Sequence, residues 1–429
     1  MSKFLIKTLG CKTNQVESAL IAEILSDNSF VETENIEEAD FYILNSCSVT
    51  HVADSKNLAY LRRAKRENPN IKIVVTGCMA QLEKDNLLKN GVADFVVGNF
   101  EKNDIAKILT GNQKMAVSDI FSHDLFRYEK LRQTQRTRAS VKIQDGCNNR
   151  CSYCTIPFAR GKNRSNSIEN IVEQINLFAS ENYYETVLTG IHIGQWGNDF
   201  RPAKSLKNLL EEIEKTNINR YRLGSLNPLE LTPDFIDFLA ESEKFCPHFH
   251  LSLQSVCDKT LKNMNRHYGA KQILDLVSYI NSKFKNAFIG SDIIVGFPDE
   301  TEEDFNITYQ NLIQTGLTKI HVFPFSARKG TIACSMPNQI SDEDKKKRVK
   351  LVQQVSDEKL TAFLEKNIST ENEVIIEKNR DKKSGLLKGI TKNYINVLVN
   401  GDDSLKDTLQ KVRLTAISDY SEKMHAEVI

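Results

Sequence analysis

The sequence predicts an α/β protein in three parts: an N-terminal parallel α/β domain, a central partial (β/α)6 barrel and a small antiparallel β-barrel at the C-terminus. Apolar runs alternate with helical patterns in residues 1–125, and six further strand–helix units follow in residues 126–365. In residues 366–429 the pattern changes to short strands separated by turn residues. Strand–helix alternation is typical of parallel sheets, whereas closely spaced short strands favour a barrel.

Four buried strands with helices between them are predicted in the first part. The helices are expected at 14–27, 54–67, 81–90 and 101–109, and the strands at FLIKTL, FYILN, IKIVVTG and DFVVGN. This order implies a parallel sheet with helices on both faces. In such sheets, ligands bind at the carboxyl ends of the strands.

Three cysteines of the first part, Cys11, Cys47 and Cys78, each come just after one of these strands. Because the carboxyl ends of parallel strands meet at one edge of a sheet, we expect the three thiols to lie close together. A single buried cysteine is usually a core residue. Three at equivalent positions favour a 4Fe–4S cluster with three protein ligands and one free iron.

The second part opens with a basic linker, about residues 126–150, that leads into the first of six predicted strands. These strands are ASVKIQDG, ETVLTG, YRLGSL, HFHLSLQ, FIGSDIIVGF and KIHVFPF. Amphipathic helices such as IENIVEQINLFASE separate them. Six βα units indicate a closed or partly closed barrel, whose active site lies at the C-terminal face of its strands.

A second cysteine triplet, Cys147, Cys151 and Cys154, follows the first strand of this barrel in a CxxxCxxC spacing. Three thiolates can hold three irons of a 4Fe–4S cluster and leave the fourth iron open to a ligand. A structural zinc site is the alternative, but it needs four ligands and is commonly built from paired CxxC units. Redox-active or structural thiols are the third interpretation.

A long helix is predicted from Ser341, as N-cap, to about residue 367, and Lys345–Arg348 on it is interpreted as a solvated face. The strands beyond it suggest a small barrel of the oligonucleotide-binding kind. Lysines and one arginine crowd the first half of that barrel, which favours RNA binding over a role in solubility alone. These residues are Lys378, Arg380, Lys382, Lys383, Lys388 and Lys392.

The bulk composition is that of a globular protein, with 40% hydrophobic and 26% charged residues among 429 and a net charge of +1. No signal-peptide or membrane-length apolar run is present, and nine cysteines without a secretion signal favour the reducing cytoplasm. Between Arg127 and Arg164, however, ten Lys and Arg residues stand against two acids. This basic belt surrounds the second triplet, which favours an anionic substrate over a solvated surface.

The motifs resemble those of the radical S-adenosylmethionine (SAM) methylthiotransferases over essentially the whole chain. They are TLGCKTNQVES, NSCSVT, TGCMAQ, VKIQDGCNNRCSYCTIPFARGKNRS, LTGIHIGQWG, HFHLSLQS, SDIIVGFPDETEEDF and HVFPFSARKGT, and the terminal segment is similar to a TRAM domain. TLGCKTN with NSCSVTHVAD resembles the MtaB-type branch, which acts on N6-threonylcarbamoyladenosine in tRNA. The isopentenyladenosine branch more often shows GCQMN, and the branch that modifies a ribosomal-protein aspartate shows GCPKN.

This resemblance implies a radical reaction, because an adenine C2–H has no acidity that a general base could use. SAM would bind the open iron held by Cys147, Cys151 and Cys154, and one electron would cleave its sulfonium to give a deoxyadenosyl radical. A sulfide on the cluster of Cys11, Cys47 and Cys78 would be methylated by a second SAM and passed to the base. The expected substrate is adenosine 37 of a tRNA anticodon stem-loop.

The resemblance also implies contact residues at the strand ends. Those expected to contact the cofactor are Tyr153, Thr189, Gly190, Ser225, Gln254, Ser255, Gly296, Phe297 and Pro298. Those expected to contact RNA are Arg160, Lys162, Arg164 and Lys388. After Gln254 and Ser255 the family commonly has a glycine, whereas Val256 follows here, and Asn227 stands where a glutamate is more usual. Cys246, Cys257 and Cys334 are interpreted as core residues.

The expected protein is a cytoplasmic monomer that receives electrons from a donor such as flavodoxin or ferredoxin; the motifs do not identify its sulfur donor. Two alternatives stay open. The same chemistry could act on isopentenyladenosine in tRNA or on a ribosomal-protein aspartate. The chain could instead be a non-catalytic iron–sulfur protein that binds RNA or senses redox state, although such a role favours fully ligated clusters over two sets of three thiols.

Overall fold

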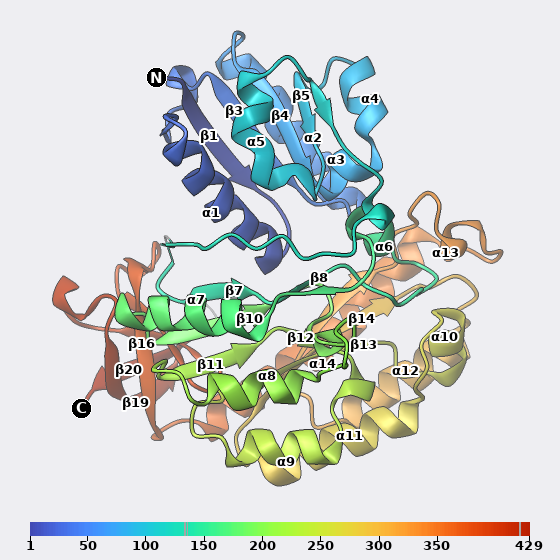
Figure 1. Cartoon of the computed structure of the whole chain (residues 1–429). Coiled ribbons are helices and arrows are strands. Elements are labelled where there is room, and N and C mark those ends of the chain that lie inside the picture. Colours follow the sequence, from blue (N-terminus) through green and yellow to red (C-terminus); the bar gives the residue numbers. More distant parts are fainter. Residues whose placement is uncertain (133, 135, 420–421) are drawn as a thin grey trace.

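The computed structural model describes residues 1–132, 134, 136–419 and 422–429. Three bodies follow one another along the chain (Figure 1): a blue α/β layer, a green-to-orange barrel beneath it and a red C-terminal barrel against one side of the central barrel. The segment of residues 117–132 runs between the first two bodies. The α/β class and the order of the three parts are therefore as predicted.

The N-terminal body is a six-stranded parallel sheet in the order β2-β1-β3-β4-β5-β6. Its strands are β1 (Lys3–Thr8), β2 (Val31–Glu32), β3 (Phe41–Ser46), β4 (Lys72–Gly77), β5 (Phe95–Val97) and β6 (Met115–Ala116). Its helices are α1 (Lys12–Asp27), α2 (His51–Glu67), α3 (Cys78–Leu82), α4 (Lys84–Lys89) and α5 (Ile105–Thr110).

Apolar residues fill both faces of this sheet, as its near-continuous hydrophobic strands predict. Helices α1 and α5 pack on one face through residues such as Ile21 and Ile105. Helices α2 and α4 cover the other face through residues such as Leu61 and Leu87. The helix expected at 81–90 is divided into α3 and α4, because the backbone of Glu83, with φ −123° and ψ 24°, leaves the helical region.

The central body consists of two parallel sheets that together form an open barrel. One has the order β11-β10-β7 and the other β12-β13-β14-β15. The strands are β7 (Ala139–Lys142), β10 (Glu185–Thr189), β11 (Arg220–Leu223), β12 (Ser225–Leu226), β13 (His248–Gln254), β14 (Phe288–Val295) and β15 (Lys319–Pro324). A short antiparallel pair, β8 (Gln144–Asp145) and β9 (Arg164–Ser165), lies at the rim.

The predicted strand YRLGSL is split between the two sheets. Gly224 separates β11 from β12, although its N–H still donates to the Leu188 carbonyl of β10 over 2.9 Å. The six predicted strands are thus present, and the third bends from one sheet into the other at a residue with no side chain.

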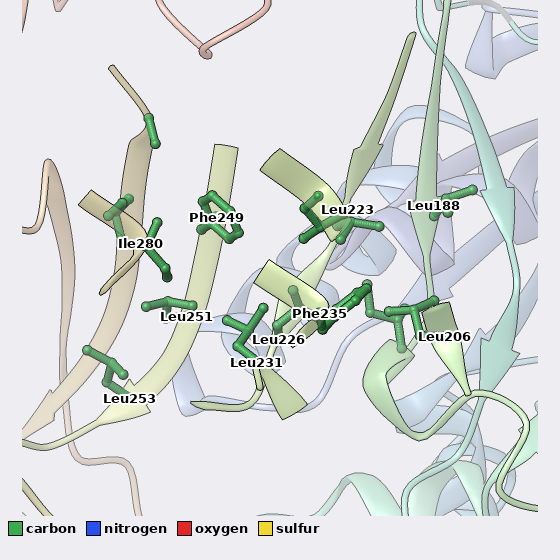
Figure 2. Packing of buried hydrophobic residues seen from close by; sticks show 14 of the residues in the cluster. Leu188, Leu206, Leu223, Leu226, Leu231, Phe235, Phe249, Leu251, Leu253 and Ile280 are labelled. Carbon is green, nitrogen blue, oxygen red and sulfur yellow. The ribbon is translucent and has the colours of Figure 1, made fainter. Parts of the chain in front are cut away.

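Helices surround these sheets, and their apolar residues pack onto the strands, as Figure 2 shows for Leu206, Phe235 and Ile280 beside Leu188, Leu223 and Phe249. The helices are α6 (Ile156–Arg160), α7 (Ile168–Ser180), α8 (Leu206–Ile213), α9 (Pro233–Glu241), α10 (Asp258–Asn263), α11 (Ala270–Lys283), α12 (Glu302–Gln314) and α13 (Ile332–Ser335).

The long predicted helix is α14 (Asp342–Lys366), and Ser341 caps it by accepting a hydrogen bond from the Asp344 N–H. The interpretation of Lys345–Arg348 as a solvated face is wrong for Arg348. Its guanidinium is buried and lies 2.7 Å from Glu300 and 2.5 Å from Glu302. Two carboxylates pair with this guanidinium, as is usual for an arginine that is buried.

The C-terminal body is a closed five-stranded barrel in the order β16-β17-β18-β20-β19. Its strands are β16 (Glu371–Arg380), β17 (Leu387–Thr391), β18 (Asn396–Val399), β19 (Leu409–Ile417) and β20 (Met424–Val428). The expectation of a purely antiparallel barrel is wrong, because β18 and β20 are parallel. Five strands cannot alternate in direction around a closed ring, so one pair must run the same way.

Buried charges fasten this barrel to the amino ends of the central strands. Arg220 donates to the Ile390 carbonyl over 3.1 Å, and Arg222 donates to the Thr391 carbonyl over 3.3 Å. Both guanidinium groups also pair with Glu185. The C-terminal barrel therefore docks at the end of the strands opposite to Cys147. In the part of the chain that the structure describes, no helix combines the length and apolar character needed to cross a membrane.

Candidate functional site

The second cysteine triplet lies in the loop between β8 and α6, at the carboxyl end of the central strands. Gly146 starts this loop with φ +71°, and a Cβ there would collide with the Lys162 carbonyl, so only glycine fits. The Cys147 N–H donates to the Gly161 carbonyl over 3.0 Å, and the Cys154 N–H to the Cys151 carbonyl over 3.1 Å. These bonds fold the loop back on itself, and its three thiols line one cavity.

This cavity, called the central cavity below, has a volume of about 380 Å³. Its walls come from five of the barrel strand ends and from the loop after β3 of the N-terminal body. Its lining includes Cys147, Cys151, Cys154, Tyr153, Arg266, Asp292, Val49 and Thr50. A cavity at the carboxyl ends of parallel strands is where this architecture places its active site.

Two cationic or hydrogen-bonding side chains contact the thiols of this triplet. Arg266 donates to Cys151 Sγ over 3.5 Å, and His192 Nδ1 lies 3.4 Å from Cys147 Sγ. Burial alone would lower the pKa of His192, but its hydrogen bonds with Cys147 and Glu230 raise the pKa to about 9. Burial raises the pKa of the Cys154 thiol to about 12, and the nearby Cys151 and Cys147 add to this. The site thus supplies positive charge where three thiolates would gather.

The donor set fits an iron–sulfur cluster better than a single ion. No group of three or more His, Cys, Asp or Glu side chains in the described ranges is arranged to hold a metal ion. Three thiols instead surround a cavity, which suits a multi-atom cluster ligated at its corners. These three thiols are the only cysteines that line this cavity among the described residues, so a 4Fe–4S cluster held by them would have one iron left for another ligand.

Only part of the predicted cofactor set faces the central cavity. Tyr153, Ser225 and Gln254 line it, whereas Thr189, Gly190, Ser255, Gly296, Phe297 and Pro298 do not. Ser255 is fully buried and lies 3.2 Å from the Thr308 hydroxyl of α12. Phe297 packs its ring edge against Tyr153 at a centroid distance of 6.2 Å, so it supports the wall from behind. Arg266 and Asp292, which sequence reasoning missed, take places in the lining instead.

The first cysteine triplet gathers at the carboxyl edge of the N-terminal sheet, as predicted. Cys11 precedes α1, Cys47 follows β3 and Cys78 begins α3, and the preceding strands β1, β3 and β4 are neighbours. Gly10, with φ +102°, brings its loop so close that a Cβ there would lie 3.1 Å from Cys47 Sγ. Burial raises the pKa of the Cys47 thiol to about 11, and Cys78 and Cys11 contribute as neighbours. The three thiols therefore share one environment.

Arg160 is fully buried and connects the two triplets. It donates to Glu17 Oε1 over 2.7 Å, to Asp145 Oδ1 over 3.1 Å and to Asn14 Oδ1 over 2.5 Å. Burial raises the pKa of the Cys78 thiol, and the charge of Arg160 opposes that rise. Glu17 also pairs with Lys102 and, over 2.7 Å, with Lys142. The acids and bases of this network come from both bodies.

This network contradicts part of the RNA-contact prediction. Arg160 has no exposed surface, and Arg164 is also buried, with its guanidinium donating to the Arg160 carbonyl over 2.9 Å. Neither side chain is available to an RNA phosphate. Lys162 is exposed and pairs with Asp124 over 2.9 Å, and Lys388 is partly exposed, 3.4 Å from Glu377. The basic belt is visible in the sequence. The pairing of Arg160 with Asp145 and Glu17, which lie 15 and 143 residues away along the chain, is visible only in the structure.

The loop after Cys47 contacts the barrel directly. Arg328, which follows β15, lies 2.6 Å from Asp54 of α2 and donates to the Ser48 hydroxyl over 2.9 Å. The His51 N–H donates to the Ser326 hydroxyl over 3.2 Å. These contacts hold Val49 and Thr50 against the central cavity, so the chain beside Cys47 forms part of its wall.

Of the three cysteines outside the two triplets, two are core residues as predicted and one is not. Cys246 and Cys257 are buried, as expected for core residues. Cys334 is exposed, so its interpretation as a core residue is wrong. It lies in the four-residue helix α13, which contributes only Ala333 to the buried core.

Two family models match this chain, one over each cysteine triplet. The family model described as "Uncharacterized protein family UPF0004" matches residues 3–98, which hold the first triplet. The model described as "Radical SAM superfamily" matches residues 141–312, which hold the second. Together the two models cover more than half of the chain.

Curated relatives align over nearly the full length. The threonylcarbamoyladenosine tRNA methylthiotransferase MtaB of Aquifex aeolicus is 35% identical over 93% of this chain and 97% of its own. The Bacillus subtilis protein of the same name is 33% identical over 100% and 97%. The tRNA-2-methylthio-N(6)-dimethylallyladenosine synthase of Pelotomaculum thermopropionicum is 31% identical over 97% and 95%.

Among solved structures, the radical S-adenosylmethionine methyltransferase TsrM from Kitasatospora setae has a similar fold. The TM-score is 0.58 at 14% identity, with 78% of this chain and 77% of that chain covered. At this identity the likeness concerns the fold alone.

Proposed function

Because the chain belongs to the radical SAM methylthiotransferase family, we propose that it converts N6-threonylcarbamoyladenosine at position 37 of tRNA to its 2-methylthio derivative. The observation that carries the proposal is that one cysteine triplet lines the central cavity and the loop that follows a cysteine of the other triplet forms part of its wall. Cys147, Cys151 and Cys154 line the cavity, and Val49 and Thr50, which follow Cys47, line it as well. Groups held by the two triplets would therefore act on a substrate that enters this space.

The chain's own residues would hold and position the reactants. Cys147, Cys151 and Cys154 would ligate one 4Fe–4S cluster, and Cys11, Cys47 and Cys78 a second. When bound, the first cluster and SAM supply the one-electron chemistry that an unactivated C2–H requires. Arg266 would stabilise the thiolate of Cys151, and Tyr153, Ser225 and Gln254 would contact the cofactor, as proposed from their place in the lining. Residues 1–125, 126–365 and 366–429 are proposed to serve as auxiliary-cluster, radical-SAM and TRAM-like RNA-binding domains.

A tRNA anticodon stem-loop is the proposed partner, with Lys162 and Lys388 as its remaining candidate contacts among the four predicted. The target adenine must leave its stack to reach the central cavity, as bases do in other enzymes that act on them. An electron donor such as flavodoxin or ferredoxin and a separate sulfur donor would complete the cycle in the cytoplasm.

A second candidate substrate is dimethylallyladenosine in tRNA. The observation in its favour is the likeness to the Pelotomaculum thermopropionicum synthase, which differs from the MtaB relatives by only a few per cent in identity. The two substrates share the adenine ring and differ in the group on N6, so the choice depends on the surroundings of that group.

The test compares nucleosides from tRNA of a strain that lacks the gene with those of its parent, by mass spectrometry. Loss of 2-methylthio-threonylcarbamoyladenosine alone is expected, and restoration of the gene on a plasmid is the control. Loss of the 2-methylthio-dimethylallyl nucleoside instead would assign the second candidate. A protein that acts on neither nucleoside, yet binds RNA, would contradict both.

A further inference from the structure

A second cavity, of about 400 Å³, lies where all three bodies meet; we call it the junction cavity. It is formed by the start of α1, the segment before β7, strand β10 and the strands β16 and β17 of the C-terminal barrel. Its lining is strongly basic. The lining residues are Lys12, Gln15, Arg136, Thr137, Arg138, Ser140, Val187, Glu377, Lys378, Asn379 and Lys388.

Five cations of this lining face one carboxylate, Glu377. The side chains of Lys12, Arg136 and Lys378 form no hydrogen bond or ion pair with any residue that the structure describes. Those of Arg138 and Lys388 are held only by long pairs: Arg138 lies 3.6 Å from Glu185 and 3.7 Å from Glu377, and Lys388 lies 3.4 Å from Glu377. Partly buried cations without close partners cost solvation energy, and an anion in the cavity would offset that cost.

The cavity has an inner and an outer end. We call the side of Lys12 and Arg138 the inner end and the side of Arg136, Lys378 and Lys388 the outer end. Arg136 is exposed, and the other four cations are partly buried. Lys12 is the first residue of α1, so it lies at the positive end of the helix dipole, and its cap residue Cys11 makes no side-chain cap bond. The inner end therefore adds a helix dipole to two cationic side chains.

The inner end is also close to the proposed chemistry. Lys12 follows Cys11 directly, and Cys11 belongs to the first thiol triplet. Val187 of β10 lines the junction cavity, and Ile191, two residues beyond the end of β10, lines the central cavity. Four residues of chain span at most about 13 Å when fully extended. That is on the order of the reach of a modified adenine from its C2 atom to the far end of an N6 substituent.

Resting on the proposed function, we propose that Lys12 and Arg138 bind the carboxylate of the threonylcarbamoyl group and so select that substrate. The threonyl carboxylate is an anion at neutral pH, whereas a dimethylallyl group carries no charge and would leave both cations unpaired. The outer cations Arg136, Lys378 and Lys388 would contact the phosphates of the same RNA. Lys12 and Arg138 are thus specificity residues, which contact the substrate away from the reacting atoms.

Both a carboxylate and a backbone phosphate are oxyanions, so the test separates these two sources. It measures equilibrium binding of fluorescent anticodon stem-loops that carry threonylcarbamoyladenosine, the same nucleoside with the carboxylate converted to an amide, dimethylallyladenosine or adenosine. The wild-type holoprotein is expected to bind the carboxylate form about 10–100-fold more tightly than the amide form. Lys12→Gln and Arg138→Gln are expected to remove most of this preference.

Lys378→Gln is the matched control at the outer end, and it should weaken binding of all four stem-loops by a similar factor and reduce the salt dependence. Because Lys12 adjoins Cys11, iron content and deoxyadenosine formation are measured for each variant. If Lys12→Gln loses iron, the Arg138→Gln variant alone is used to test the inference. A wild-type protein that binds acid and amide equally would overturn the inference, as would inner variants that weaken all four RNAs alike. A wild-type preference for the dimethylallyl stem-loop would instead reject the proposed function itself.

Discussion

The guanidinium of Arg160 lies 2.7 Å from the Oε1 atom of Glu17, and this pair joins helix α6 of the barrel to helix α1 of the N-terminal body. Arg160 lies six residues after Cys154, and Glu17 lies six residues after Cys11. This buried ion pair, with the Lys142–Glu17 pair beside it, links chain segments that adjoin the two thiol triplets.

Arg160→Met should lower the free energy of unfolding by about 3–5 kcal/mol, because it leaves Glu17 and Asp145 buried with fewer cationic partners. Urea unfolding of the purified protein measures the change. Lys162→Met is the matched control two residues along the chain, where an exposed pair with Asp124 contributes about 1 kcal/mol or less. Equal losses in the two variants would contradict the buried network.

Stability should fall as the pH drops into the range where carboxylates protonate. Burial would raise the pKa of Glu17, but Arg160, Lys102 and Lys142 outweigh it and hold the pKa well below its usual range. A carboxyl whose folded pKa is depressed contributes stability that is present above its unfolded pKa, about 4.3, and is lost as the pH falls through the folded pKa.

Urea unfolding at several pH values between 7 and 3 tests this linkage. The wild-type free energy of unfolding should decrease below about pH 4.5. Glu17→Gln should be less stable at pH 7 and should lose less on acidification, since one linked proton is removed. Parallel curves for the two proteins would show that Glu17 is not the linked group.

Cys151→Ala should abolish SAM cleavage, whereas Cys47→Ala should retain cleavage and stop sulfur insertion. The reason is that the two thiols belong to triplets with different proposed tasks: Cys151 lines the central cavity, and Cys47 belongs to the triplet at the edge of the N-terminal sheet. Deoxyadenosine formation and methylthiolated nucleoside are measured in the same anaerobic reaction. Methylthiolated tRNA from Cys47→Ala would refute the sulfur-holding role of the first triplet.

Arg266→Gln should slow SAM cleavage about 10–100-fold, which is the usual cost of removing a group that tunes a metal ligand. Arg266 donates to Cys151 Sγ over 3.5 Å and faces the central cavity. Lys262→Gln is the control, because Lys262 is exposed on the neighbouring helix α10. The cleavage rate is measured at saturating reductant, and a shifted cluster absorption spectrum should accompany the slower rate.

Arg328→Met should uncouple cleavage from transfer. Arg328 holds the loop after Cys47 through Asp54 at 2.6 Å and Ser48 at 2.9 Å, and it lies outside the thiol lining. Without it, the wall formed by Val49 and Thr50 loses a support, so deoxyadenosine should form without matching product. The ratio of deoxyadenosine to methylthiolated nucleoside should rise several-fold. An unchanged ratio would mean that this contact does not position the loop.

Local patterns were sufficient to predict the elements and the six thiols. The runs before Cys11, Cys47 and Cys78 are apolar enough to be buried strands, and parallel strands bring their carboxyl ends together. The spacing of Cys147, Cys151 and Cys154 is likewise a property of eight consecutive residues. The bend at Gly224 and the parallel pair β18–β20 were missed, because each depends on how strands close in space.

Sequence patterns alone were enough to place two sets of three thiols along the chain, each set after predicted strands of an alternating strand–helix chain. Only the tertiary structure decided how they are used. It turned Arg160 and Arg164 from expected RNA contacts into buried partners of acids, and it placed Val49 in the lining of the cavity that Cys147 also lines. The physical reason is range: backbone periodicity is set by neighbours within a few residues, whereas the charge that faces an arginine is set by packing across 143 positions of the chain.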